Sequence, residues 1–350
     1  MSTIYDVVNP KFTATRWEES ELDREPYLLT AFFPEIKQMG IELSFLQGNS
    51  PKVRPLDLSA FDVKVLPLSR EAFNKITTEM PFFKNALSIN EKMRQELLKV
   101  LSTGNQQYID VVLGQIYNDN KTLLDDANVT REVMRAQLLT TGSIAFASNG
   151  QAVSYDFGVP SANKKTLSGT AKWDAPDTAD PVNDIIGWQD AVENNTGIRP
   201  TNLLMNRVTF NLMKKAASIK DTILATYYSG KTLVSDAMVK QFIMEQTGCT
   251  IYVYDKGYTN KDTGNFTKFV ADNVVVLFPE GAMGEFVFGT TPEEADLMNG
   301  ATDAEVSIVD LGVALTTIKE KDPVNVMTKV SMVALPTLER PNQMIIATVA

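Results

Sequence analysis

Gly230, Lys231 and Thr232 stand in the stretch ATYYSGKTLVSD (residues 225–236) and are of the types that end a phosphate-binding loop. Such a loop also needs a glycine five residues before the Gly-Lys pair and a buried strand in front of it, because the backbone must curl around the phosphate. Here the first position is Ala225, and the residues before it have a helical pattern. The sequence therefore predicts a turn between two helices and no nucleotide site.

The histidine count is the strongest restriction on catalysis, because the chain contains no histidine in 350 residues. This excludes Ser-His-Asp and Cys-His catalytic arrangements and every His-ligated metal site. The one cysteine, Cys249, lies in TGCTIYVY, a stretch typical of a buried strand. We expect a small core residue rather than a reactive thiol, and no disulfide within the chain can form. An enzyme with this composition would have to use carboxylates or a Ser-Lys pair.

Clustered carboxylates are the remaining candidates for chemistry. Thr291-Pro292-Glu293-Glu294 fits a capping box with proline in the first helical position, which is a structural role. The spacing of the other clusters does not match a calcium loop. These clusters are Asp125-Asp126 and the series Asp174, Asp177 and Asp180. We therefore expect no metal and no cofactor, and a carboxylate-based hydrolase remains an alternative because catalytic carboxylates can be paired in space without a sequence pattern.

The charge balance argues against a dedicated nucleic-acid binder. The chain has 33 basic and 43 acidic residues, a formal net charge of -10, and its basic residues cluster only in pairs. A nucleic-acid interface normally requires a basic face. No apolar run approaches the roughly 20 residues of a membrane-spanning helix, and the first residues lack the pattern of a secretory signal. We therefore expect no membrane partner and a protein made in the cytoplasm.

The first 70 residues predict segments that depend on other surfaces. Residues 1–35 mix charged and aromatic residues without a clean period, which suggests an extended arm that gains order from a partner. Residues 41–68 alternate apolar and polar residues around a turn at 48–51, so we expect two long strands in a hairpin. An isolated hairpin is marginally stable, so it must lie on something else.

Residues 88–158 predict helices followed by a hairpin. Ser88 to Glu91 fits a capping box, and an apolar stripe to Ile116 predicts a long helix that Gly104 could kink. A second helix is expected from about Asn128 to Gly142. Residues 143–158 contain Asn149-Gly150 between alternating runs, a strong hairpin signal.

The rest of the chain predicts a compact α+β domain and long return strands. Residues 160–181 are rich in turn formers and suggest a domain boundary. Residues 181–299 predict a helix capped by Asp180, a strand at TNLLM, two further helices, and a meander of three strands. Strands at 312–320 and 324–336 should form a hairpin, and we expect these long strands to pair with residues 143–158.

Four stretches, taken in order, resemble the major capsid protein of tailed bacteriophages, specifically the lambda-type major head protein family. None is a catalytic signature, so the resemblance rests on their joint order along nearly the whole chain. They are REVMRAQLLTTGSIAFASNGQAVSYDFGVP (131–160), RPTNLLMNRVTFNLMKK (199–215), VLFPEGAMGEFVFGTTPEE (276–294) and LPTLERPNQMIIATVA (335–350).

The resemblance implies the tailed-phage major capsid fold, of class α+β, and a structural protein rather than an enzyme. The implied parts are an N-terminal arm, an extended hairpin loop, a peripheral domain with a long spine helix, return strands of that domain, and an axial domain inserted between them. In this chain they would be residues 1–40, 41–72, 73–160, 300–350 and 161–299.

The resemblance also implies partners and a location. Copies of the chain would form pentamers and hexamers of an icosahedral head that encloses double-stranded DNA without sequence-specific binding. Scaffolding and portal proteins would take part in assembly, and a decoration protein could bind the shell. The extended loop would find its support on a neighbouring subunit, and the protein would be located in the virion after assembly in the host cytoplasm.

Five side chains are predicted to contact neighbouring subunits. The arm contributes Arg16 and Trp17, and the extended loop contributes Lys52, Arg54 and Lys64. Each could equally be an ordinary solvated side chain, since the family resemblance supplies no contact motif. Some related capsids join a loop lysine to an asparagine of a neighbour, but we do not expect a Lys64–Asn342 crosslink. An encapsulin-type nanocompartment shell, which shares the fold, is the alternative in the same structural class.

Overall fold

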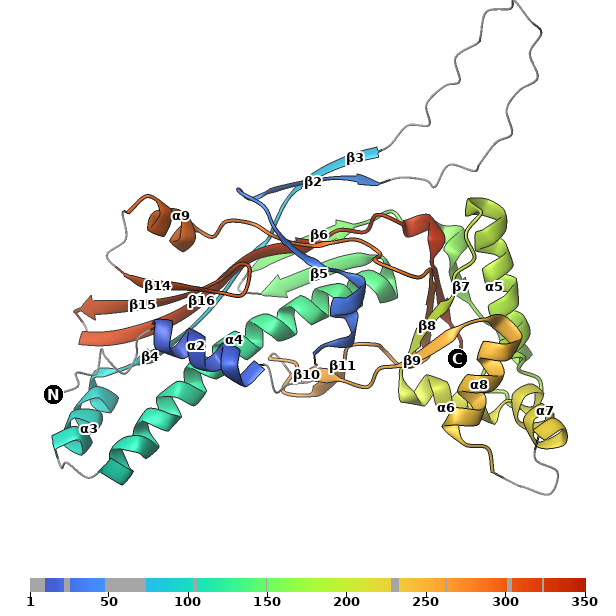
Figure 1. Cartoon of the computed structure of the whole chain (residues 1–350), viewed down its shortest axis with the longest axis horizontal. Helices are drawn as coiled ribbons and strands as arrows, with labels where there is room; N and C mark the ends of the chain where they lie inside the picture. Colours follow the sequence, from blue (N-terminus) through green and yellow to red (C-terminus); the bar gives the residue numbers. More distant parts are fainter. Residues whose placement is uncertain are drawn as a thin grey trace, which may run out of the picture. The chain divides into compact units, whose positions relative to one another are not determined.

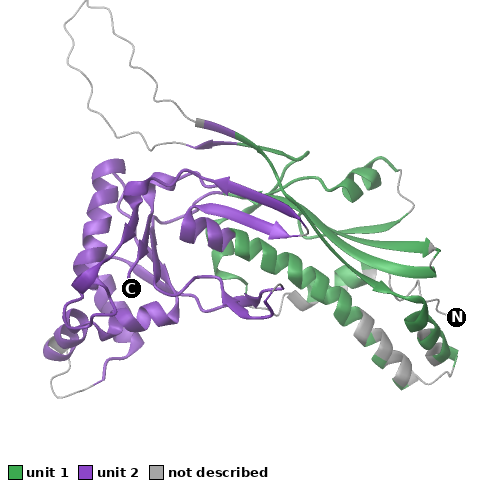
Figure 2. Cartoon of the chain, turned by 180° about the vertical axis from the view of Figure 1, so that it is seen from behind, with its two compact units in different colours: residues 1–44, 77–134, 285–336 green, residues 45–76, 135–284, 337–350 purple. Residues whose placement is uncertain are grey.

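The chain folds into two compact units, each assembled from three separate segments (Figure 2). Unit 1 comprises residues 1–44, 77–134 and 285–336, and unit 2 comprises residues 45–76, 135–284 and 337–350. The computed structural model describes residues 10–21, 26–47, 74–102, 106–148, 150–227, 233–261, 263–300, 304–322 and 324–350. The two units are described separately below.

Unit 1 is built on a six-stranded sheet whose longest strand is β16 (Figure 1). Strand β16 pairs antiparallel with β15, which in turn pairs with β14. Strand β16 also pairs antiparallel with β4 over residues 326–333 and with β13 at its end, and β13 pairs in parallel with β1. The strands are β1 (Glu35–Lys37), β4 (Phe82–Ile89), β13 (Phe286–Phe288), β14 (Glu305–Val309), β15 (Val313–Lys321) and β16 (Val324–Pro336). The predicted hairpin of return strands is thus confirmed as β15 and β16.

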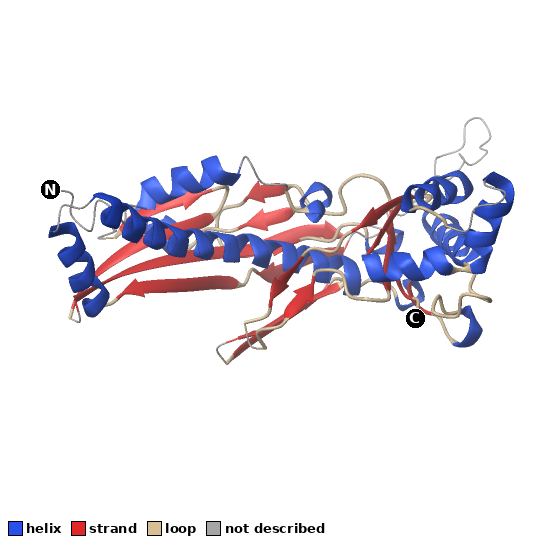
Figure 3. Ribbon diagram, turned by 90° about the horizontal axis from the view of Figure 1, so that it is seen from below, coloured by secondary structure: helices blue, strands red, loops and turns tan. Residues whose placement is uncertain are grey.

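A 36-residue helix, α4 (Gln106–Thr141), lies along one face of this sheet (Figure 3). The prediction of a separate helix beginning near Asn128 is wrong, because α4 runs through that position without a break. No proline or glycine interrupts residues 115–141, and a strip of buried side chains that includes Leu124, Met134 and Leu138 stabilises the continuous helix.

The helix before it, α3 (Glu91–Ser102), begins later than the sequence predicts. Ser88 is paired with Met327 in the sheet, so strand hydrogen bonds displace the expected capping box. Asn90 takes the capping role instead, since its side-chain Oδ1 accepts a hydrogen bond from the backbone N–H of Met93 at 3.0 Å. Gly104, the predicted kink, lies outside the described residues.

The N-terminal segment is folded against its own chain, which corrects the prediction of an extended arm. Residues Pro10–Glu21 form helix α2, and Leu28–Phe32 form a short 3-10 helix. Thr13, Ala14 and Trp17 are buried and recur at the three-to-four-residue spacing of one helical face. Arg16 and the glutamates that follow Trp17 obscured this period in the sequence.

Unit 2 contains a five-stranded sheet centred on β12 (Val274–Phe278). Strand β12 pairs antiparallel with β8 and β17, and these pair in parallel with β9 and β7 respectively. The outer four strands are β7 (Lys164–Thr166), β8 (Asn202–Met205), β9 (Thr250–Val253) and β17 (Ile345–Thr348). The predicted three-stranded meander is therefore wrong, because β9 and β12 are both neighbours of β8 rather than of each other.

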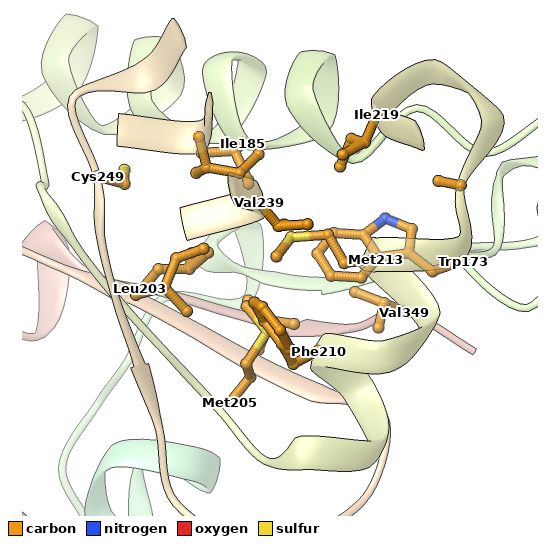
Figure 4. Packing of buried hydrophobic residues seen from close by; sticks show 14 of the residues in the cluster. Trp173, Ile185, Leu203, Met205, Phe210, Met213, Ile219, Val239, Cys249 and Val349 are labelled. Atoms are coloured by element: carbon orange, nitrogen blue, oxygen red, sulfur yellow. The ribbon is translucent and has the colours of Figure 1, made fainter. Parts of the chain in front are cut away.

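Four helices cover this sheet and enclose the core of unit 2 (Figure 4). Trp173, Phe210 and Met213 are fully buried there, and Trp173 stacks on Trp188 with ring centroids 6.2 Å apart. The helices are α5 (Pro181–Thr196), α6 (Arg207–Lys215), α7 (Ala217–Tyr227) and α8 (Asp236–Thr247). Asp180 caps α5 as predicted, and Gly197 ends it with a φ of 75°, a conformation that favours glycine.

The hairpin predicted at residues 143–158 is confirmed, but its predicted sheet partners are not. Strands β5 (Ser143–Ser148) and β6 (Gln151–Asp156) pair with each other as a separate two-stranded sheet. The long strands β15 and β16 pair with other strands, and β17 belongs to the sheet of unit 2. Strand alternation sets which face is buried, but it does not specify a partner strand.

Two further pairs complete the described strands. Strand β2 (Glu42–Gln47) pairs with β3 (Asn74–Glu79), and β10 (Gly257–Thr259) pairs with β11 (Phe266–Lys268). Phe45 of β2 is buried and stacks on Phe157 at 6.2 Å, both in unit 2. The turn predicted at residues 48–51 and the strand predicted after it lie outside the described residues.

Candidate functional site

The Gly-Lys-Thr stretch has no strand in front of it. Residues Ala217–Tyr227 form helix α7, whereas a phosphate-binding loop follows a buried strand. Gly230, Lys231 and Thr232 themselves lie outside the described residues. The architecture before them is therefore that of a connection between helices α7 and α8.

The acidic clusters act as structural hydrogen-bond acceptors. Asp125 accepts a hydrogen bond from the indole Nε1 of Trp17 at 3.1 Å, and Asp126 accepts one from Nδ2 of Asn85 at 3.0 Å. Asp180 caps helix α5. Across the described residues, no group of three or more Cys, Asp or Glu side chains is arranged to hold a metal ion.

Cys249 is a core residue, as the sequence predicts. Its side chain is fully buried, and its Sγ lies 3.2 Å from Nε2 of Gln189. Burial raises the pKa of the Cys249 thiol and so disfavours the reactive thiolate. Within the described part of the chain, no helix is long and apolar enough to cross a membrane.

The five predicted contact residues are placed only in part. Trp17 is 1% exposed and packs inside unit 1, where its indole binds Asp125. Arg16 lies next to it on α2, and its side chain is outside the described part of the structure. Lys52, Arg54 and Lys64 also fall outside the described residues. Of the five side chains the structure thus places only Trp17, and the subunit contacts stay predictions.

The N-terminal segment is held in unit 1 by ion pairs. The sequence did not indicate them. Arg131 of α4 is the central cation, with its side chain 6% exposed. Its Nη1 lies 3.3 Å from a carboxylate oxygen of Glu35 on β1, and its Nη2 lies 3.0 Å from Oδ2 of Asp310 at the β14–β15 turn. The guanidinium also lies over the ring of Phe288 at 5.7 Å. One residue thus joins strand β1, helix α4 and the edge of the sheet.

A second ion pair joins β1 to helix α9 (Pro292–Met298). Nζ of Lys37 lies 2.6 Å from Oε2 of Glu294 and donates to the carbonyl oxygen of Gly289 at 2.9 Å. Thr291 caps α9 by accepting a hydrogen bond from the N–H of Glu294, so the predicted cap is confirmed. The capping pattern in the sequence explained the start of α9, but it gave no sign of the contact with Lys37, 257 residues away.

Glu293, on the same helix turn, binds β16. Its carboxylate pairs with Lys329 and accepts a hydrogen bond from the hydroxyl of Ser331 at 2.7 Å. Burial of Glu293 acts to raise its pKa, but the hydrogen bonds from Lys329 and Ser331 outweigh it and hold the pKa below its usual value of 4.5. The carboxylate is thus held in its charged form by the sheet.

The two units differ in charge. Unit 1 contains 13 Lys and Arg residues against 25 Asp and Glu residues, whereas unit 2 contains 20 against 18. The entire negative excess of the chain therefore belongs to unit 1. A surface of this sign repels other acidic surfaces and polyanions unless a partner or counterions offset it.

A match to a known protein family shows what kind of protein this chain is. The sequence profile of the family "Phage major capsid protein E" matches residues 15–349. The chain belongs to this family. It is therefore a capsid shell protein of a phage, found in the virion, and a structural protein rather than an enzyme. No curated protein sequence matches it.

Solved structures support the fold of this capsid protein. A protein assigned as the capsid protein of a prophage in E. coli CFT073 is 13% identical with a TM-score of 0.60, over 98% of this chain and 99% of that chain. A phage-related protein from Bordetella bronchiseptica RB50 is 13% identical with a TM-score of 0.58, over 97% of both chains. The capsid of cyanophage A-1(L) is 11% identical with a TM-score of 0.51, over 92% of both chains. The α+β fold is thus the tailed-phage capsid fold.

Proposed function

We propose that copies of this capsid protein form the pentamers and hexamers of an icosahedral head that encloses double-stranded DNA. The observation that carries this proposal is the family match over residues 15–349, which includes both folded units. The net negative charge of the chain is suited to a capsid shell, because a basic inner face would bind the packaged DNA, which is a polyanion. DNA would therefore be enclosed without sequence-specific binding.

We divide the chain into the parts that the tailed-phage capsid fold has. We assign residues 1–40 to an N-terminal arm, 41–72 to an extended loop, 73–160 with 300–350 to a peripheral domain, and 161–299 to an axial domain. The long helix α4 and the sheet of β15 and β16 support the peripheral assignment, and the core of unit 2 supports the axial one. The compact units have different limits, because residues 135–160 and 337–350 group with unit 2.

The contacts between subunits are part of the same proposal. Arg16 and the arm segment around Trp17 would contact a neighbour, with the Trp17 side chain itself buried in its own unit. Lys52, Arg54 and Lys64 would do so through the extended loop, which would add to or pack on a neighbouring subunit. Scaffolding and portal proteins would act during assembly in the host cytoplasm, and a decoration protein could bind the outer surface. We place the chain with lambda-type heads on the sequence resemblance.

Negative-stain microscopy and sedimentation test the proposal directly. The full chain is expressed alone and together with the genes upstream of it, which would supply a scaffold. Shells, or rings of five and six subunits, are the expected products and would give the geometry of the head. A monodisperse monomer under both conditions would overturn the proposal.

A further inference from the structure

Helix α3 has a surface that its own chain leaves uncovered. Met93 and Leu98 are 45% and 49% exposed, and among the described side chains of α3 every one except Arg94 is exposed. A helix of 12 residues is marginally stable in water by itself, because its stability comes mainly from packing of an apolar face. The described side chains of α3 therefore offer a surface that a partner can cover.

Two hydrogen bonds hold the first turn of α3 in place. Asn90 caps the helix through the N–H of Met93, and the carboxylate of Glu91 accepts a hydrogen bond from the N–H of Val324 at 3.0 Å. The bond from Val324 ties α3 to the end of the sheet where β16 begins (Figures 1 and 3). The first turn of the helix is thus anchored before a partner binds, which lowers the entropy cost of docking.

Exposed apolar side chains also occur on other elements of unit 1. Leu87 near the end of β4 is 44% exposed, Val324 at the start of β16 is 42% exposed, and Val111 in the early turns of α4 is 69% exposed. Single exposed apolar side chains are ordinary, but Leu87 and Val324 lie on strands beside the start of α3, and a group of this kind is typical of a protein interaction site.

The charge of α3 indicates the kind of partner. Residues 91–102 contain three cations, Lys92, Arg94 and Lys99, and two carboxylates, Glu91 and Glu96. The rest of the unit that carries this helix has more than twice as many acidic as basic residues. A mildly basic helix complements the acidic surface of another unit 1 and would be attracted to it.

We propose that α3, with Leu87 and Val324 beside it, docks on unit 1 of a second copy of this chain in the assembled shell. The inference rests on the proposed assembly into pentamers and hexamers. The contact is heterologous, since a basic and apolar surface on one copy meets a different, acidic surface on the next. Contacts of this kind generate rings where the rotation between copies closes, as in a pentamer or hexamer.

A charge placed in the apolar surface tests the contact. Met93→Glu and Leu98→Glu are combined in one variant, and Met244→Glu is the control, because Met244 is 49% exposed on α8, a helix of the same length in unit 2. We expect the α3 variant to lower the assembled fraction at least about tenfold in sedimentation, and the control to assemble as the wild type does. Far-UV circular dichroism and the melting temperature of the unassembled subunit establish that each variant is folded.

Hydrogen exchange measures the contact in the unaltered protein. Backbone amides of residues 91–102 should exchange at least about tenfold more slowly in purified shells than in unassembled subunits. A charge reversal, Lys99→Glu, should reduce this protection, whereas Lys240→Glu on α8 should leave it unchanged. Equal exchange in shells and subunits would overturn the proposal, and so would protection that requires a separate scaffolding protein and disappears from shells without it.

The outcomes separate this inference from the proposed function. Wild-type shells together with unimpaired assembly of the Met93→Glu, Leu98→Glu variant would overturn the α3 contact and leave the shell function standing. A wild-type chain that forms neither shells nor rings would overturn both.

Discussion

Nη2 of Arg131 lies 3.0 Å from Oδ2 of Asp310, so a helix residue is joined to a turn residue 179 positions later in the chain. Glu35 lies on the same guanidinium from the N-terminal side. The three segments of unit 1 therefore meet at one buried cation. Its removal should affect the whole unit rather than one element.

Arg131→Met should lower the free energy of unfolding of the unassembled subunit by about 3 kcal/mol, because it leaves two partly buried carboxylates without their cation. Urea denaturation measures this loss. Lys319→Met is the matched control in the same unit, since Lys319 and Glu305 form an exposed pair with side chains 43% and 45% accessible. The control should cost no more than about 1 kcal/mol. Equal losses in the two variants would contradict a structural role for the buried cation.

Glu293 should make the stability of unit 1 depend on pH in the acid range. Its pKa is lower in the folded chain than its usual value of 4.5, so its stabilising contribution is complete above that value and is lost as pH falls through the lowered pKa. Glu293→Gln should therefore be less stable than wild type at pH 7, and the difference should shrink as the pH approaches about 3.

Denaturation curves at several pH values check this expectation. Glu305→Gln is the control, because this carboxylate pairs with Lys319 on the exposed surface and should affect stability only slightly. A difference between wild type and Glu293→Gln that stays constant from pH 7 to about pH 3 would show that the Glu293 charge is not stabilised by Lys329 and Ser331.

Trp17→Ala should destabilise the unassembled subunit by about 3 kcal/mol, because it empties a buried site and removes the hydrogen bond to Asp125. Trp17→Phe should cost less, since the ring volume is mostly kept. Thermal unfolding measures stability, and shell yield measures assembly. If Trp17 acts mainly between subunits, Trp17→Ala would lower the yield of shells while the melting temperature of the subunit stays the same.

The single thiol offers a simple check on the core of unit 2. Cys249 is fully buried with a raised pKa, so a thiol reagent at neutral pH should label the native chain at least about a hundredfold more slowly than the urea-unfolded chain. Because the sequence contains no other cysteine, each labelled molecule reports this site alone. Rapid labelling of native protein would mean that the core around β9 opens readily.

The sequence determined the class of protein and many local elements. The absence of histidine and the failed phosphate-loop pattern argued against an enzyme, and four ordered stretches pointed to the capsid family that the profile match establishes. Helices with a strong cap and stop, such as α5 between Asp180 and Gly197, were predictable because their signals are local. The hairpin of β5 and β6 was predictable for the same reason.

Only the tertiary structure decided which segments meet. Strand alternation did not show that β17 joins the sheet of unit 2, and charged residues hid the buried face of α2 around Trp17. The ion pairs of Arg131 and Lys37 connect residues at least 96 positions apart, so no local pattern could contain them. Periodicity and capping act over a few residues, whereas strand partners and buried charge pairs are selected by packing of the whole chain.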